Sequence, residues 1–164
     1  MNKASLQDSF VKGRAQTNMD GFYNGKLLVL LPCTFLEHFA GFFVNFYLPW
    51  KGKYFYQKNH KGENILPKSA KKLLLLLPTK IIVDNSNSGG FHAFPFKTSL
   101  TKGVDDPVNV LHLDYDIPQN PPLIKRVVDE VVETEGGVFL GKAYLKEKNR
   151  QRLLAYFTLQ KGTL

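Results

Sequence analysis

The sequence has little cysteine and no long apolar run. Its single cysteine, Cys33, excludes an internal disulfide and favours a reducing compartment, so we expect a cytoplasmic protein. The longest largely apolar stretch, residues 27–49, is interrupted by Pro32 and Glu37. It therefore lacks the roughly 20 consecutive apolar residues that a membrane-spanning helix needs. Residues 1–16 lack the apolar centre of a secretory signal, which supports the same expectation.

Several recognisable catalytic motifs are also missing. The chain has no Gly-x-Ser-x-Gly elbow, phosphate-binding loop, dinucleotide fingerprint or cysteine pair, so no cofactor and no metal are expected. The net charge of +8 could attract nucleic acid or an anionic membrane surface. However, the lysines and arginines are scattered, and no Arg-rich helix or RNA-binding aromatic strand occurs, which argues against a dedicated nucleic-acid binder.

Apolar and aromatic residues are plentiful. Of the 164 residues, 43% are hydrophobic, and 13 Phe and 7 Tyr are among them, which is enough for one packed domain. Residues 1–19 are polar and are interpreted as a flexible N-terminal arm or a short helix. Residues 20–164 are expected to form a single barrel-like β domain.

Alternating and β-branched segments separated by turn residues predict about seven strands. They cover residues 22–31, 50–57, 81–83, 91–100, 108–117, 138–146 and 152–160. Because hairpins or short helices join most of them, we expect an antiparallel sheet that closes, or nearly closes, into a barrel.

About three helices are expected within this mainly β (α+β) fold. The first runs from Thr34 to Tyr47 and is apolar on almost every side, and the second covers residues 68–77. The third begins after Asn120, whose side chain is predicted to cap it, and ends at 136–137. Its apolar residues at 124, 127, 128 and 131 follow helical spacing, and charged residues, Asp129 and Glu130 among them, take the other side.

Two motifs carry a resemblance to a known family. Residues 21–25, Gly-Phe-Tyr-Asn-Gly, resemble the Gly-x-aromatic-x-Gly motif of the GXWXG-domain proteins, with Tyr23 where Trp usually stands. Residues 50–55, Trp-Lys-Gly-Lys-Tyr-Phe, resemble the second motif of that family. Patches at 115–116, 139–142 and 156–159 extend the likeness. The resemblance implies a calycin-like barrel, an architecture that holds apolar molecules, in a functionally uncharacterised family.

An aromatic-x-Gly-Lys pattern occurs three times and suggests a ligand site. A glycine in a strand permits close approach, and the following lysine could meet a carboxylate or phosphate. The alternative is a barrel filled by glycine–aromatic pairs, with solvated lysines. The ligand hypothesis predicts a cavity of roughly 300 Å³ or more beside Trp50 and the 35–47 helix. The candidate ligand-binding residues are Tyr23, Lys26, Phe39, Phe42, Phe46, Trp50, Lys53, Lys142 and Tyr144.

The leading hypothesis is therefore an intracellular binding protein for an apolar or amphipathic, lipid-like small molecule. A second is a small enzyme of isomerase or hydrolase type that uses His112, Asp114 and Asp116 on one strand face, opposite the apolar residues 111, 113, 115 and 117. The alternative is that these three residues lie on the solvent-exposed face of an ordinary strand. In that case we expect the pKa of His112 to stay near its free value. A third is a peripheral membrane module that uses the basic charge and the apolar 35–47 helix.

Overall fold

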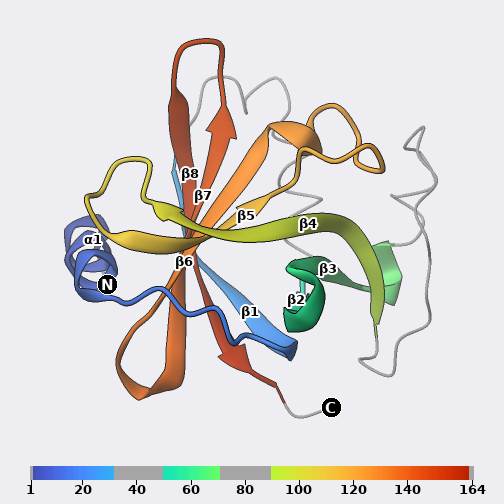
Figure 1. Ribbon diagram of the computed structural model, residues 1–164, viewed down its shortest axis with the longest axis horizontal. Helices are drawn as coiled ribbons and strands as arrows, with labels where there is room; N and C mark the ends of the chain where they lie inside the picture. The colour runs from blue at the N-terminus through green and yellow to red at the C-terminus, as the bar shows by residue number, and fades with distance from the viewer. Residues whose placement is uncertain (1, 32–49, 71–89, 163–164) are drawn as a thin grey trace.

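Eight antiparallel strands close into a barrel in the computed structural model, which describes residues 2–31, 50–70 and 90–162 (Figure 1). Each strand pairs with the next along the chain, and the last pairs with the first. The strands are β1 (Gly21–Leu30), β2 (Gly52–Tyr56), β3 (Lys61–Pro67), β4 (Gly90–Lys102), β5 (Asn109–Asp114), β6 (Val127–Glu133), β7 (Val138–Lys146) and β8 (Gln151–Lys161). The prediction of a closed antiparallel barrel is confirmed, and β3 and β6 are strands that were not expected.

Two-residue alternation separates the inside of the barrel from its outside. On β5, Leu111 and Leu113 join the interior core, whereas Val110 packs with a second apolar cluster on the outer face. On β8, Phe157 and Leu159 point inward, and Tyr156 points outward. Neighbouring residues point to opposite faces because the strand is pleated.

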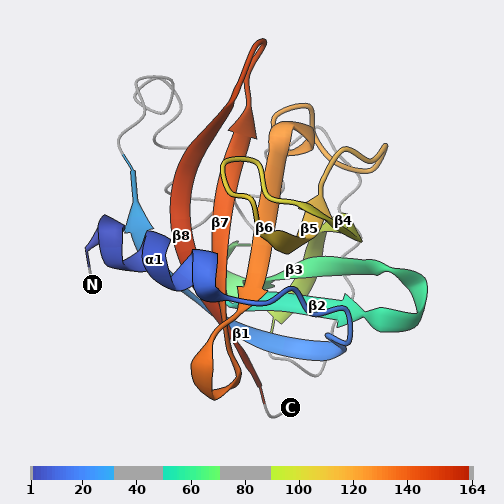
Figure 2. The same cartoon turned by 60° about the vertical axis from the view of Figure 1, so that its left-hand side comes forward.

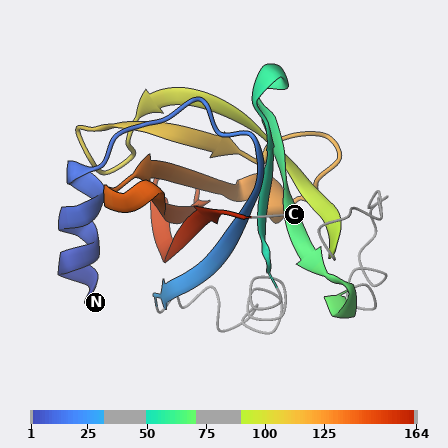
Figure 3. The ribbon, with the colours of Figure 1, turned by 90° about the horizontal axis from the view of Figure 1, so that it is seen from below.

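One α-helix lies against the outside of the barrel. Helix α1 (Lys3–Lys12) begins at Asn2, whose side-chain oxygen accepts the Ser5 N–H at 2.9 Å. Leu6 and Phe10 are fully buried in the outer cluster, and Figure 2 and Figure 3 show the helix along the barrel wall. The N-terminal segment, expected as a flexible arm or a short helix, thus contains a docked helix.

The prediction of a helix after Asn120 is wrong. A 3₁₀ turn over Ile124–Arg126 leads directly into β6. Val127 and Val131 face the barrel core, whereas Val132 packs beneath α1 on the outer face. Because both faces of β6 are buried, pairs of valines stand on each side of Asp129 and Glu130, and the spacing of these valines resembles a helical stripe.

The predicted cap at Asn120 is also absent. Its side-chain amide instead donates to the backbone oxygens of Pro95, at 2.7 Å, and Tyr115, at 2.8 Å. The side chain is buried and ties together the turn after β5 and the middle of β4. Asn120 therefore fixes a loop rather than a helix end.

The other two predicted helices are described only in small part. The helix over Thr34–Tyr47 and the short strand at 81–83 lie outside the described residues. Of residues 68–77, only Lys68–Ala70 are described, and they form one 3₁₀ turn. In the described ranges α1 is the one α-helix, and no helix there is long and apolar enough to cross a membrane.

Candidate functional site

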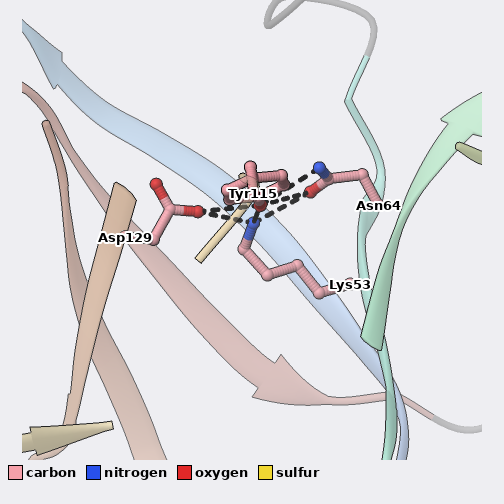
Figure 4. Close-up of polar contacts among 4 residues, drawn as sticks. All are labelled: Lys53, Asn64, Tyr115 and Asp129. Atoms are coloured by element: carbon pink, nitrogen blue, oxygen red, sulfur yellow. Dashed lines mark hydrogen bonds and ion pairs between the residues drawn. The ribbon is translucent and has the colours of Figure 1, made fainter. Parts of the chain in front are cut away.

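Four polar side chains meet inside the barrel (Figure 4). They are Lys53 from β2, Asn64 from β3, Tyr115 just after β5, and Asp129 from β6. Lys53 Nζ donates to Asp129 Oδ2 and to Asn64 Oδ1, each at 2.8 Å. It also donates to the Tyr115 hydroxyl oxygen at 2.5 Å. All four residues are buried, so this interior cluster is shielded from solvent.

Further hydrogen bonds in the interior cluster link the other three residues. The Tyr115 hydroxyl donates to Asp129 Oδ2 at 3.0 Å, and the Asn64 amide donates to the Tyr115 oxygen at 3.1 Å. The other carboxylate oxygen, Asp129 Oδ1, is buried without a hydrogen-bond partner in the described structure. An unsatisfied oxygen in a low-dielectric interior costs free energy. Apolar side chains in the same place would not carry this cost.

Strand register brings the interior cluster together. Lys53 and Asn64 are direct cross-strand partners, so their side chains share the inner face of β2 and β3. Asp129 lies opposite Leu113 and therefore also points inward. Tyr115 lies two residues beyond Leu113 and continues the same inward alternation.

Aromatic rings surround the Lys53 ammonium. Its Nζ lies 5.2 to 5.4 Å from four ring centroids, a distance at which cation–π attraction operates. The rings belong to Trp50, Phe96, Tyr115 and Phe157. Burial lowers the pKa of Lys53 below its ordinary value, and the Asp129 carboxylate opposes part of that change.

A small void adjoins the interior cluster. Its volume is about 20 Å³, enough for about one water molecule and far below the roughly 300 Å³ at which ligand pockets begin. Among the described residues, the space beside Trp50 is thus much smaller than the predicted cavity, whose other predicted wall, residues 35–47, lies outside the described residues. The void is lined by Trp50, Asn64, Leu66, Phe94, Tyr115, Ile124 and Val127.

Three strand glycines seat aromatic rings inside the barrel. A Cβ atom added at Gly25 would lie 2.4 Å from the Trp50 ring, and one at Gly141 would lie 2.2 Å from the Phe157 ring. Gly62 has the same relation to Phe96, at 2.4 Å. These distances leave no room for a side chain. Glycine–aromatic pairs therefore fill these three places in the described interior, while Lys53 and Lys142 are buried rather than solvated.

Lys142 lies on the outer face, not beside Lys53. Its Nζ contacts Asp106 Oδ2 at 2.5 Å and sits 4.3 Å from the Phe10 ring centroid under α1. Asp106 also accepts from the Gln7 amide of α1 at 2.5 Å, and Gln7 in turn accepts from the Tyr156 hydroxyl at 3.0 Å. This outer cluster fastens α1 and the 103–108 loop to the barrel.

Glu130 belongs to the same outer face, as the β6 partner of Lys142. Its Oε1 accepts the backbone N–H of Val104 at 2.6 Å, and its Oε2 is buried without a hydrogen-bond partner in the described structure. Burial raises the pKa of this carboxyl to about 7, despite the Val104 N–H and Lys142, and the carboxylates of Asp106 and Asp105 raise it further. The 103–108 loop is therefore held, through the Val104 N–H, by a carboxyl group that titrates near neutral pH.

The three residues of the enzyme hypothesis do not form a cleft in the described structure. His112 and Asp114 lie on the outer face of β5, and Asp116 is exposed. Asp114 pairs with Lys146 at 2.9 Å and also accepts the Asp116 backbone N–H at 3.2 Å. Burial lowers the pKa of His112 from its ordinary value and outweighs the opposing effect of the Asp114 carboxylate.

The remaining candidates divide among three places. Tyr23 is inside the barrel and makes edge-on ring contacts with Phe55 and Phe139. Lys26 is exposed on β1, and Tyr144 lies on the outer face with Lys142. Three of the candidates, Phe39, Phe42 and Phe46, fall outside the described residues. Of the candidates that the structure describes, only Trp50 and Lys53 lie at the interior cluster.

Sequence reasoning missed three members of the interior cluster: Asn64, Tyr115 and Asp129. Tyr115 was placed on the apolar face of its strand, which is correct, but its hydroxyl gave no separate signal. Asp129 was assigned to the polar side of a helix. The available signal was a charged residue flanked by valines. If such a segment is a strand buried on both faces, its charged side chain has no solvated position and must find a buried partner.

No metal cluster is present in the described ranges, where no group of three or more His, Cys, Asp or Glu side chains could hold an ion. Among known proteins, no family model matches the chain, and no curated protein sequence matches it. A crystal structure of a protein from Thermomonospora curvata is similar in fold, with a TM-score of 0.57. The match covers 99% of this chain and 89% of that chain at 13% sequence identity, so it supports the eight-stranded barrel fold and nothing finer.

Proposed function

We propose that this barrel binds a small apolar or amphipathic molecule whose polar end reaches the interior cluster beside Trp50. The observation that carries the proposal is the convergence of four buried polar side chains on a barrel lined elsewhere by aromatic and aliphatic groups. Small-molecule sites combine mostly apolar walls with a few convergent polar groups. The resemblance to the calycin-like GXWXG-domain proteins points in the same direction.

The energetics of the interior cluster support a role beyond stability. Desolvating Lys53 and Asp129 costs several kcal/mol for each ion, and well-packed apolar residues of similar volume are often at least as stable. A chain selected for stability alone has little reason to keep this pair. Asn64 and Tyr115 line the neighbouring void, so two polar side chains of the interior cluster border a space that a ligand group could enter.

Entry of a ligand requires a side chain to move, because the void of about 20 Å³ holds no more than a water molecule. Trp50 is the side chain best placed to do so. It is only partly buried, it precedes β2, and its ring lies against Gly25 and edge-on to Phe157 at 5.4 Å.

Trp50 is also the single tryptophan of the chain, so tryptophan fluorescence, excited selectively over the seven tyrosines, reports on this site alone. We expect a saturable change in its emission when the protein is titrated with a medium-chain compound such as methyl undecanoate or undecanol. A Lys26→Ala variant, altered at an exposed lysine on β1, should behave like the wild type. Native mass spectrometry should show a one-to-one adduct. No saturable change and no adduct with any chain compound would refute the proposal.

A further inference from the structure

The interior cluster is already neutral before a ligand arrives. Lys53 and Asp129 carry one positive and one negative charge and lie 2.8 Å apart. An ammonium group has three N–H donors, and Lys53 directs them to Asp129, Asn64 and Tyr115. A ligand carboxylate would find no unused donor on Lys53 and would add a net negative charge to a buried site, which is strongly unfavourable.

The unused polar groups at the void are neutral N–H donors. Trp50 Nε1 is buried without a hydrogen-bond partner in the described structure, and Trp50 lines the void. The Asn64 amide has two hydrogens, of which Tyr115 receives one. Its orientation is fixed because Lys53 can only donate and must therefore face Asn64 Oδ1. The unpaired Asp129 Oδ1 is not part of the void wall.

We infer that the ligand is a neutral molecule with a hydrogen-bond-accepting oxygen, a ketone or ester, and not a carboxylate. The inference rests on the proposed function and specifies its ligand class. An ester or ketone oxygen would accept from Trp50 Nε1–H and from the second N–H of Asn64, while the Lys53–Asp129 pair stays intact. The expectation that Lys53 receives a carboxylate or phosphate is thereby replaced.

Methyl undecanoate and undecanoic acid form a matched pair, since they share chain and carbonyl and differ in charge at pH 7. We expect the ester to bind at least about tenfold more tightly than the acid in titrations followed by Trp50 fluorescence, because a buried unpaired charge costs more than one hydrogen bond. Equal affinities, or a preference for the acid, would overturn the ligand class while leaving the proposed function standing. Absence of binding by both would overturn the proposed function itself.

A Trp50→Phe variant tests the donor directly, with binding measured by calorimetry. It keeps an aromatic ring but removes the N–H, so the affinity for the ester should fall about tenfold. Tyr54→Phe is the matched control, because Tyr54 lies on the outer side of β2 against Tyr56 and His92 and should leave the affinity unchanged. An unchanged affinity in Trp50→Phe, with the barrel folded by circular dichroism, would show that Trp50 Nε1 is not the donor and would refute the inference.

Discussion

The buried carboxyl of Glu130 predicts a specific dependence of stability on pH. In the folded chain its pKa is raised from the ordinary 4.5 to about 7, first by burial. The folded state therefore retains this proton between about pH 4.5 and 7, whereas the unfolded state loses it. The stabilisation is fully present below the unfolded pKa and disappears as the pH rises through the folded pKa.

The size of the effect follows from the shift. A change of one pKa unit corresponds to 1.36 kcal/mol, so a rise from 4.5 to about 7 corresponds to about 3 kcal/mol, most of which is lost between pH 5 and 8. Substitution Glu130→Gln removes the titration and keeps an oxygen for the Val104 N–H. Relative to the wild type, we expect the free energy of unfolding of the variant to increase by about 2–3 kcal/mol from pH 5 to pH 8.

Urea unfolding followed by Trp50 fluorescence at pH 5, 6, 7 and 8 measures this difference. Comparing variant with wild type at each pH cancels the titration of all other groups. Glu135→Gln, at an exposed position in the turn before β7, is the control and should change stability little. A difference between Glu130→Gln and wild type that stays constant across this range would refute the reasoning, since it would mean that Glu130 is ionised alike in both states.

Three further changes test the packing and the polar interior by thermal or urea unfolding. Gly141→Ala places a Cβ 2.2 Å from the Phe157 ring and should cost about 1–3 kcal/mol; an unchanged midpoint would show that the ring is not seated there. Asn120→Ala leaves two backbone carbonyl groups without their donors and should also cost about 1–3 kcal/mol, a loss that a solvent-facing Asn120 would not show. Lys53→Met strands the buried Asp129 and should cost about 3–5 kcal/mol, and adding Asp129→Leu should recover most of it. If the double variant is no more stable than Lys53→Met, the two charges are not paired.

The sequence alone was enough to predict the strands with clear boundaries and two different faces. Alternation over 110–117 correctly separated Leu111, Leu113 and Tyr115 from His112 and Asp114, because a pleated strand leaves no other arrangement. Turn residues between such segments predicted hairpins, and successive hairpins predicted a closed antiparallel sheet. The strand glycines beside aromatic residues also predicted close packing in the interior.

The tertiary structure decided what covers each face, and this the local sequence does not contain. The Val127–Glu133 segment reads as a helix because α1 and the barrel core bury it from both sides, which hides the two-residue period. Lys53 and Lys142 follow the same aromatic-x-Gly-Lys pattern, yet one points inward and the other outward beneath α1. The interior cluster itself joins residues up to 76 positions apart, from Lys53 to Asp129, and only strand register brings them within hydrogen-bonding distance.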